Sequence, residues 1–272
     1  MVALALELFA VGIVASFLGS IVGLGGAFVA IPILRLAFHL SPALTAGTSL
    51  FLVTANVASA SLNFLRQGRV DRRLGTIMGL FAIPGSIAGA FALKAFTPKG
   101  FDIAYAVTLV FFAVDLFRRS VGDARPTGPV RLPWGTLRTF TDRLGVTYAY
   151  EESLPLAAIA GIGAGFVSSF FGIGGGVIVI PLLLRAFAMP VHIVTATSHY
   201  VILLSSPFGI ASHAYQGDIV WLYAIPLGVG GVVGAQTARR LSSPTLVRTL
   251  AAIMLVAATS LVGQHVTMKG PP

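Results

Sequence analysis

The sequence predicts an all-α polytopic membrane protein that consists of two inverted-topology repeats. Each repeat is expected to hold about five helical segments, including one glycine-broken or re-entrant pair. Three observations lead to this prediction: a strongly apolar composition, apolar segments long enough to cross a bilayer, and several sequence marks that recur at one fixed spacing.

The composition excludes a soluble globular domain. Hydrophobic residues make up 56% of the chain and charged residues 10%, whereas a soluble domain carries about 25% charged residues. Apolar stretches recur that match the ~20 residues needed to cross roughly 30 Å of hydrocarbon. They are continuous rather than alternating, so a membrane strand barrel is not expected. The chain has no cysteine, which excludes disulfides, thiolate metal sites and cysteine nucleophiles.

The positive charge is assigned to membrane topology rather than to nucleic acid. The net charge is +9 and the isoelectric point about 10.7. Most of the 18 lysine and arginine residues fall around residues 66–73, 118–143, 185 and 239–248. These regions share the inner side if both termini face outside, as the positive-inside rule requires. No signal peptide is predicted, because the N-terminus lacks a basic region and Glu7 lies within the first apolar run.

The first membrane repeat is predicted over residues 1–117. Its segments are expected at about residues 3–22, 28–38, 43–65, 74–96 and 101–117. The second segment is too short to span alone, so it is either a half-helix or one arm of a re-entrant hairpin. In the fourth segment, Gly85 and Gly89 provide a small-residue face for close contact between helices.

Residues 118–153 are predicted to form a cytoplasmic polar loop. Within it, apolar residues recur at three- to four-residue spacing, which favours an amphipathic piece on the membrane surface. These residues are Trp134, Leu137, Phe140, Leu144 and Tyr148. The β-branched and aromatic run Val146-Thr147-Tyr148 favours a short strand as the alternative.

The second membrane repeat is predicted over residues 154–272. Its segments are expected at about residues 154–171, 177–188, 191–215, 220–238 and 245–262. The glycine break at residues 23–26 returns at residues 172–176, a shift of 149 positions. Each half then contributes an odd number of crossings, so the halves are expected to sit upside down relative to each other.

Further marks recur in the same order in the two halves. Those with the same offset are Pro32 with Pro181, Thr48 with Thr197, Ser49 with Ser198, and Gly68 with Gly217. Because these marks are independent of one another, they indicate a duplication.

The two glycine breaks are predicted to build one anion site between the halves. A glycine-rich break before a helix leaves backbone N–H groups unpaired, admits a ligand without a Cβ in the way, and adds the positive end of a helix dipole. Such a site holds an anion without a charged side chain, although a single break is more typical of close helix packing. The residues expected around the anion are Gly25, Gly26, Ala27, Thr48, Ser49, Gly174, Gly175, Gly176, Thr197, Ser198 and His199.

Ionisable residues within the apolar segments are further candidates. His199 is interpreted as a substrate ligand or proton carrier, with a packing histidine as the alternative. Arg35 and His213 are candidates for gating or proton coupling, the alternatives being a snorkelling arginine and an interfacial histidine. Residues expected at the interface are Asp102, Asp115 and Glu7. The apolar segments show no nucleophile–base pair or metal cluster, so we expect no enzyme, no cofactor and no metal site.

These motifs resemble those of the sulfite exporter TauE/SafE family. The resemblance rests on Gly172 to Gly176 with Pro181, on Gly23 to Gly26 with Pro32, on the Thr-Ser pairs, and on the turns at Gly68 and Gly217. It covers nearly the whole chain apart from the middle loop. It implies a multi-span transporter of sulfite, sulfonates or related small anions. Ala27 corresponds to Gly176, and Leu50 to His199, so the two half-sites are expected to be unequal.

The combined prediction is a secondary transporter that exports a small sulfur-containing oxyanion, sulfite, across the cytoplasmic (inner) membrane. The alternative is an importer or channel for another small anion, such as a sulfonate or small carboxylate. The expected partners are the substrate anion and the lipid bilayer, without nucleic acid, and a homo-oligomer stays an open alternative.

Overall fold

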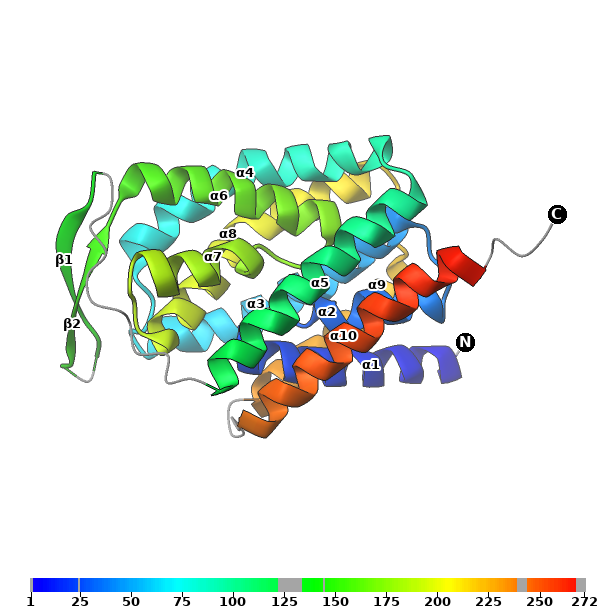
Figure 1. Cartoon of the computed structure of the whole chain (residues 1–272), viewed down its shortest axis with the longest axis horizontal. Helices are drawn as coiled ribbons and strands as arrows, with labels where there is room; N and C mark the ends of the chain where they lie inside the picture. Colours follow the sequence, from blue (N-terminus) through cyan, green and yellow to red (C-terminus); the bar gives the residue numbers. More distant parts are fainter. Residues whose placement is uncertain (1, 24, 122–133, 144, 239–243, 268–272) are drawn as a thin grey trace.

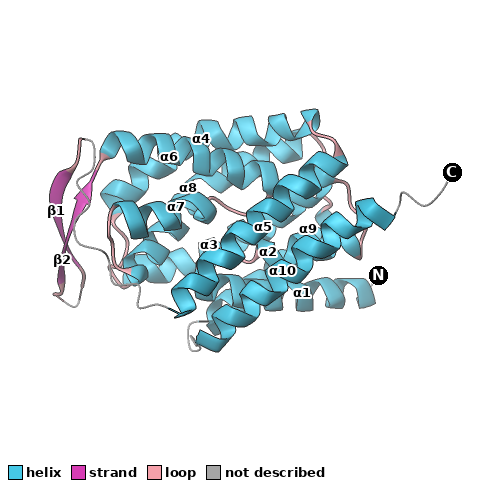
Figure 2. Ribbon diagram, viewed as in Figure 1, coloured by secondary structure: helices cyan, strands magenta, loops and turns pink. Residues whose placement is uncertain are grey.

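The computed structural model describes residues 2–23, 25–121, 134–143, 145–238 and 244–267. Figure 2 shows that helices make up almost all of it. The first-half elements are α1 (Val2–Val22), α2 (Ala27–Leu36), α3 (Pro42–Arg66), α4 (Arg72–Ala92), the 3-10 turn η1 (Leu93–Ala95) and α5 (Pro98–Val121). The second-half helices are α6 (Leu154–Phe171), α7 (Gly176–Pro181), the π-helical turn η2 (Leu182–Ala186), α8 (Val191–Tyr215), α9 (Trp221–Thr237) and α10 (Pro244–Thr267).

Each apolar segment expected from the sequence forms a helix. The bounds of α6 and α8 agree with the expected ones, and the other helices begin or end within a few residues of them. Five helical stretches are long and apolar enough to cross a membrane: Val2–Ser20, Pro42–Arg66, Arg72–Ala95, Leu154–Phe171 and Val191–Tyr215. The chain is therefore a multi-pass helical membrane protein, as its composition indicates.

The ends of α3 and α8 follow from local sequence signals. Pro42 occupies the first turn of α3, where its missing N–H costs nothing, and the Ser41 hydroxyl accepts a hydrogen bond from the Leu44 N–H. Beyond the other end of α3, Gly68 has a φ of 67°, and Gly217 after α8 has a φ of 74°. Glycine adopts this left-handed conformation without strain, which ends both helices.

Residues 136–152 form a β-hairpin. The prediction of an amphipathic piece on the membrane surface was therefore wrong, and the alternative of a short strand is confirmed. Strands β1 (Thr136–Thr141) and β2 (Thr147–Glu152) pair antiparallel. The Asp142 carboxylate accepts a hydrogen bond from the Val146 N–H at 3.0 Å, and Gly145 supplies a φ of 81° in the turn. The strand propensity of this threonine- and tyrosine-rich sequence outweighs the helical spacing of its apolar residues.

Close helix pairs hold the bundle together. α4 packs along α6, α1 along α9, and α3 lies against both α8 and α9. Figure 1 shows α5 and α10 side by side across the front of the bundle. A Cβ added to Gly85 would lie 2.0 Å from the Ile162 carbonyl oxygen, and one on Gly89 2.2 Å from that of Phe166. The predicted small-residue face of α4 is therefore confirmed as a close contact with α6.

The hairpin lies at one end of the bundle, whereas α1 begins and α10 ends at the other (Figure 1). Arginines from the predicted inner loops meet at the hairpin end, where Arg143 donates a hydrogen bond to the Arg66 carbonyl. Residues 122–133 and 239–243 of the predicted arginine-rich loops lie outside the described residues.

Ion pairs attach the hairpin to the start of α4. Arg138 Nη1 lies 2.7 Å from Glu152 Oε2 and 3.3 Å from Asp71 Oδ2, and Arg73 lies 3.4 Å from Glu152. The Tyr150 hydroxyl donates a hydrogen bond to Asp71. Burial and this hydrogen bond raise the pKa of Tyr150, so the phenol stays protonated as a donor. Asp71 also caps α4, because its Oδ1 accepts from the Leu74 N–H.

Candidate functional site

Both predicted glycine breaks have the backbone conformations that only glycine adopts easily. In the first break Gly23, Gly25 and Gly26 have φ values of 85°, 78° and 91°. In the second, Gly172 and Gly174 have φ values of 77° and 79°. Helix α2 begins directly after the first break, and α7 with η2 forms a second short helical piece, Gly176–Ala186. Each break thus presents a helix N-terminus within an apolar region.

The two breaks meet at one side chain of α3. A Cβ added to either Gly25 or Gly174 would lie 2.9 Å from the same Val53 Cγ1. A Cβ on Gly176 would lie 3.0 Å from the Gly23 carbonyl oxygen. The N-terminal ends of α2 and α7, which are 149 positions apart in the sequence, are therefore neighbours in space.

The far ends of the two short pieces are tied to opposite ends of α5. Arg35, near the end of α2, makes a two-pronged ion pair with Asp102, with contacts of 2.8 and 2.5 Å. Arg185, in η2, pairs with Asp115. These two aspartates are about 20 Å apart along the helix axis. α2 and the α7–η2 piece therefore leave the glycine breaks in opposite directions.

The side chains of Asp102 and Asp115, which were expected at the membrane interface, are buried within the protein. Their side chains are 0% and 4% exposed. An arginine from an element distant in sequence forms an ion pair with each buried carboxylate. This attraction offsets the free energy lost when the carboxylate is removed from water. Arg35 is accordingly engaged by Asp102 and by the Leu40 carbonyl rather than snorkelling outward. Glu7 is exposed.

The two Thr-Ser pairs hold backbone groups of the opposite half. Thr48 Oγ1 accepts a hydrogen bond from the Val220 N–H at 3.1 Å, and Thr197 Oγ1 accepts one from the Asp71 N–H at 3.1 Å. The residues at each end of these two contacts differ by the same 149 positions. Ser49 Oγ donates to the Gly172 carbonyl at 3.0 Å, which ties α3 to the second break.

Ser198 lies at the second break with an unsatisfied hydroxyl. A Cβ on Gly176 would lie 3.3 Å from its Oγ. The side chain is fully buried, and its Oγ has no hydrogen-bond partner among the described residues. Buried hydroxyls without a partner are costly and uncommon, which makes this oxygen a candidate for contact with a ligand.

His199 is buried in α8 with one ring nitrogen engaged. Nδ1 lies 2.8 Å from the Thr195 carbonyl oxygen, which can only accept, so Nδ1 carries the proton. Nε2 is buried and finds no partner in the described part of the chain. The ring meets Phe64 edge-on, with 5.4 Å between centroids. In the neutral imidazole Nε2 is therefore an unused acceptor.

His213 forms a second polar centre, at the end of α8 nearer the termini. Its Nε2 lies 2.9 Å from the Ser169 carbonyl oxygen, and its Nδ1 lies 3.7 Å from Asp218 Oδ2. The Ser86 and Ser169 hydroxyls are hydrogen-bonded 2.6 Å apart close by. Sequence reasoning missed Asp218 as a partner. Its signal is an acidic residue in the turn five positions after an intramembrane histidine. Within the described ranges, no three His, Cys, Asp or Glu side chains gather to hold a metal ion.

Comparison with known proteins gives a consistent result. A family model described as "Sulfite exporter TauE/SafE" matches residues 8–262. The probable membrane transporter protein YunE of Bacillus subtilis is 30% identical over 94% of this chain and 96% of its own length. YdhB of the same organism, also named a probable membrane transporter protein, is 27% identical over 85% of each chain. A probable membrane transporter protein of Haemophilus influenzae is 26% identical over 91% of this chain and 89% of its own. No solved structure matches the chain significantly.

Proposed function

Because the chain belongs to the sulfite exporter TauE/SafE family of membrane transporters, we propose that it is a secondary transporter that exports a small sulfur-containing oxyanion, with sulfite as the substrate. The membrane is the cytoplasmic membrane, and both chain termini face outside. An importer or channel for a sulfonate or small carboxylate is the alternative that the experiment below separates.

The observation that carries the proposal is the meeting of the two glycine breaks at Val53. The N-terminal ends of α2 and α7, whose first backbone N–H groups have no partner within the helix, lie next to each other there. Each dipole end stabilises a partly buried anion by up to about 2 kcal/mol. The site therefore offsets part of the cost of dehydrating an anion. No lysine or arginine is among the residues proposed to bind it, so release does not require breaking a contact with a permanent charge.

Side chains on α3 and α8 complete the proposed site. The Ser198 hydroxyl and His199 Nε2 are buried, and neither has a hydrogen-bond partner among the described residues. The Ser49 hydroxyl donates to the Gly172 carbonyl of the second break. Thr48 and Thr197 accept hydrogen bonds from the N–H groups of Val220 and Asp71, at the starts of α9 and α4. The anion-binding set is Gly25, Gly26, Ala27, Thr48, Ser49, Gly174, Gly175, Gly176, Thr197, Ser198 and His199.

The transport cycle is proposed to follow from two inverted repeats, residues 1–117 and 154–272, joined by the cytoplasmic segment 118–153. The exchange of partners between the halves supports this: α1 packs on α9 as α6 packs on α4, and α3 packs on α9 as α8 packs on α4. Rocking of one half against the other then exposes the central site to each side in turn. An inside-negative potential favours anion export by about 2.3 kcal/mol per charge per 100 mV.

The tautomer of His199 favours movement of a proton with the anion. With Nδ1 donating to Thr195, a neutral Nε2 repels an oxyanion but accepts a hydrogen bond from the O–H of hydrogensulfite. A protonated Nε2 instead donates to sulfite. In both cases the occupied site contains one more proton than sulfite alone. His213 with Asp218 and Arg35 with Asp102 are the remaining candidates for coupling or gating.

The test is sulfite flux into proteoliposomes under an imposed potential. Gly176→Ala adds a methyl group 3.0 Å from the Gly23 carbonyl oxygen and 3.3 Å from Ser198 Oγ, at a backbone position without positive φ. We expect its flux to fall at least about tenfold, the effect of 1.4 kcal/mol. The matched control is Gly163→Ala in α6, where the nearest atom would be Ile178 Cδ1 at 3.6 Å.

Saturable sulfite flux in the wild type, lost in Gly176→Ala and kept in Gly163→Ala, supports the site. Equal flux in both variants contradicts it. Non-saturating currents indicate a channel, and preferential flux of a sulfonate or carboxylate replaces sulfite as the substrate. Sulfite uptake driven by an inside-negative potential requires co-transported cations that outweigh the charge of the anion, and it indicates an importer.

A further inference from the structure

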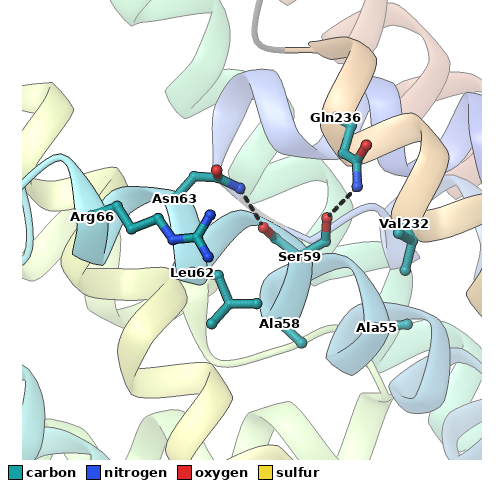
Figure 3. Close-up of a pocket in the computed structure, with 8 residues that line it drawn as sticks. All are labelled: Ala55, Ala58, Ser59, Leu62, Asn63, Arg66, Val232 and Gln236. Atoms are coloured by element: carbon teal, nitrogen blue, oxygen red, sulfur yellow. Dashed lines mark hydrogen bonds between the residues drawn. The ribbon is translucent and has the colours of Figure 1, made fainter.

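A cavity of about 540 Å³ lies between the ends of α3 and α9. Figure 3 shows its walls: Ser59, Asn63 and Arg66 come from α3, and Val232 and Gln236 from α9. Arg66 is the last residue of α3 and Gln236 lies next to the last residue of α9, so the cavity sits at the end of the bundle that carries the hairpin.

The lining combines four apolar side chains with four polar ones that a lipid-facing groove would not need. The apolar residues are Ala55, Ala58, Leu62 and Val232, and the polar ones are Ser59, Asn63, Arg66 and Gln236. Asn63 Nδ2 donates to the Ser59 carbonyl at 2.9 Å, and Gln236 Nε2 donates to Ser59 Oγ at 3.4 Å. Figure 3 shows the Arg66 guanidinium turned back toward Asn63 and Leu62. Ser59 lies roughly 10 Å along the helix from Arg66. Amide and hydroxyl groups at this depth are costly in hydrocarbon, so the cavity is suited to water and a polar solute.

The polar face of α3 continues inward from the cavity to the glycine breaks. Asn56, Ser59, Asn63 and Arg66 are spaced by three or four residues, which places them on one side of the helix. Asn56 is fully buried and donates to the Ser16 carbonyl at 3.3 Å and to Ser20 Oγ at 2.9 Å.

Ser16 joins this face to the first break. A Cβ on Gly26 would lie 2.8 Å from Ser16 Cα, and the buried Ser16 Oγ has no partner in the described ranges. The contact of Asn56 with α1 thus separates the cavity from the proposed anion site in this conformation.

We propose that this cavity is the cytosolic vestibule through which the substrate anion reaches the glycine breaks. The inference rests on the proposed function. Arg66 attracts the anion at the mouth, Asn63, Ser59 and Gln236 hydrogen-bond it along the way, and the contact of Asn56 with Ser16 and Ser20 is the barrier that opens when the site faces inward. The solute is a free small anion rather than a lipid phosphate, because the polar groups extend two helical turns beyond the charged mouth.

The absence of native cysteine permits a direct test with single-cysteine variants. Ser59→Cys places a thiol in the cavity, and Ile159→Cys places a control thiol on α6, where Ile159 is 67% exposed and is not among the residues that line the cavity. The probe is a membrane-impermeant sulfonated maleimide added to inside-out vesicles. Its thioether adduct survives the later addition of sulfite, unlike a disulfide. We expect Ser59→Cys to react at least about tenfold faster, because the reactive thiolate forms in water and not in lipid.

The labelled vesicles are then washed and assayed for sulfite flux. We expect the adduct at residue 59 to abolish flux. Equal, slow labelling of both cysteines means a lipid-filled groove and overturns the vestibule. Fast labelling at residue 59 with wild-type flux overturns its role in transport. If vesicles with the wild-type protein move no sulfite, the proposed function fails instead, and labelling is then followed by flux of the sulfonate or carboxylate that the protein does move.

The role of Arg66 predicts a change in KM rather than in maximal rate. Arg66→Gln should raise the KM for the anion roughly three- to tenfold at low ionic strength, and Arg66→Lys should keep it near the wild-type value. Added salt should reduce the difference, because the Debye length is only about 10 Å at 0.1 M. An unchanged KM at low ionic strength would rule out electrostatic attraction at the mouth.

Discussion

For individual residues such as Ser198 and His199, the sequence predicts a polar role in the membrane but not the contacts of the side chains. A histidine after a Thr-Ser pair within an apolar run is visible in the sequence, and it indicates a polar function inside the membrane. The sequence does not show that Thr195 occupies Nδ1, or that Ser198 Oγ faces Gly176. Asp218 belongs to the same class, because its relation to His213 depends on how the chain turns after α8.

Ser198→Ala should impair transport without destabilising the protein. The hydroxyl has no partner within the described structure, so its removal costs no internal hydrogen bond. A hydrogen bond to a charged ligand contributes about 1.5–3 kcal/mol, so the KM for sulfite should rise roughly 10- to 100-fold. Flux kinetics and the melting temperature in detergent are the two measurements.

Ser206→Ala is the matched control for that experiment. Ser206 lies on the same helix, is fully buried and likewise lacks a partner among the residues described, but it does not border the glycine breaks. Both variants should melt near the wild-type temperature. A wild-type KM in Ser198→Ala, or an equal rise in both variants, would remove Ser198 from the site.

At the scale of elements, the sequence places the helices well because their signals are local. Apolar runs, Pro42, Gly68 and Gly217 fix where α3 and α8 begin or end. The hairpin shows the limit, since residues 134–148 carry both a helical spacing of apolar residues and strand-forming residue types. The strands are favoured because β1 pairs with β2 and because Tyr150 of β2 donates a hydrogen bond to Asp71.

Attachment of the hairpin predicts an alkaline limit to stability that depends on Tyr150. The folded state raises the pKa of this phenol above the ordinary value of about 10. Its contribution to stability is therefore complete below about pH 10 and is lost progressively as the pH rises further. Tyr150→Phe should lower the melting temperature at pH 8, where the phenol is a donor to Asp71, by a few degrees.

The difference between wild type and Tyr150→Phe should shrink above pH 10, measured by thermal unfolding in detergent from pH 7 to 11. Tyr148→Phe is the control, because the neighbouring tyrosine does not donate to Asp71. A difference that grows with pH would contradict the assigned contact.

At the scale of the whole molecule, the bundle places its hairpin and the outer ends of α1 and α10 at opposite ends (Figure 1). This separation agrees with the charge distribution that predicts both termini outside. The proposal that the hairpin end is cytosolic rests on the arginines there, since positively charged loops are retained inside. The same end contains the proposed vestibule, so the direction of the molecule in the membrane decides from which side the anion enters it.

Topology is testable with two further single-cysteine variants at exposed threonines. Thr139→Cys lies in β1, and Thr97→Cys lies between η1 and α5 at the opposite end of the bundle. An impermeant maleimide applied to intact cells should label Thr97→Cys only, and both after the membrane is permeabilised. Labelling of Thr139→Cys alone in intact cells would reverse the orientation and, with it, the assignment of the vestibule to the cytosol.

Composition and local sequence patterns are enough to predict a helical membrane protein, the positions of its apolar helices, and the two glycine breaks with their constant spacing. These features depend on the length of apolar runs and on the backbone freedom of glycine, which are local properties. Three features could be found only in the tertiary structure: the breaks meet at Val53, Asp102 and Asp115 are buried against Arg35 and Arg185, and a cavity lies between the ends of α3 and α9. The partners in these contacts are far apart in the chain. Which of several polar groups meet inside the bundle depends on how the helices pack, because each buried group must find its partner there.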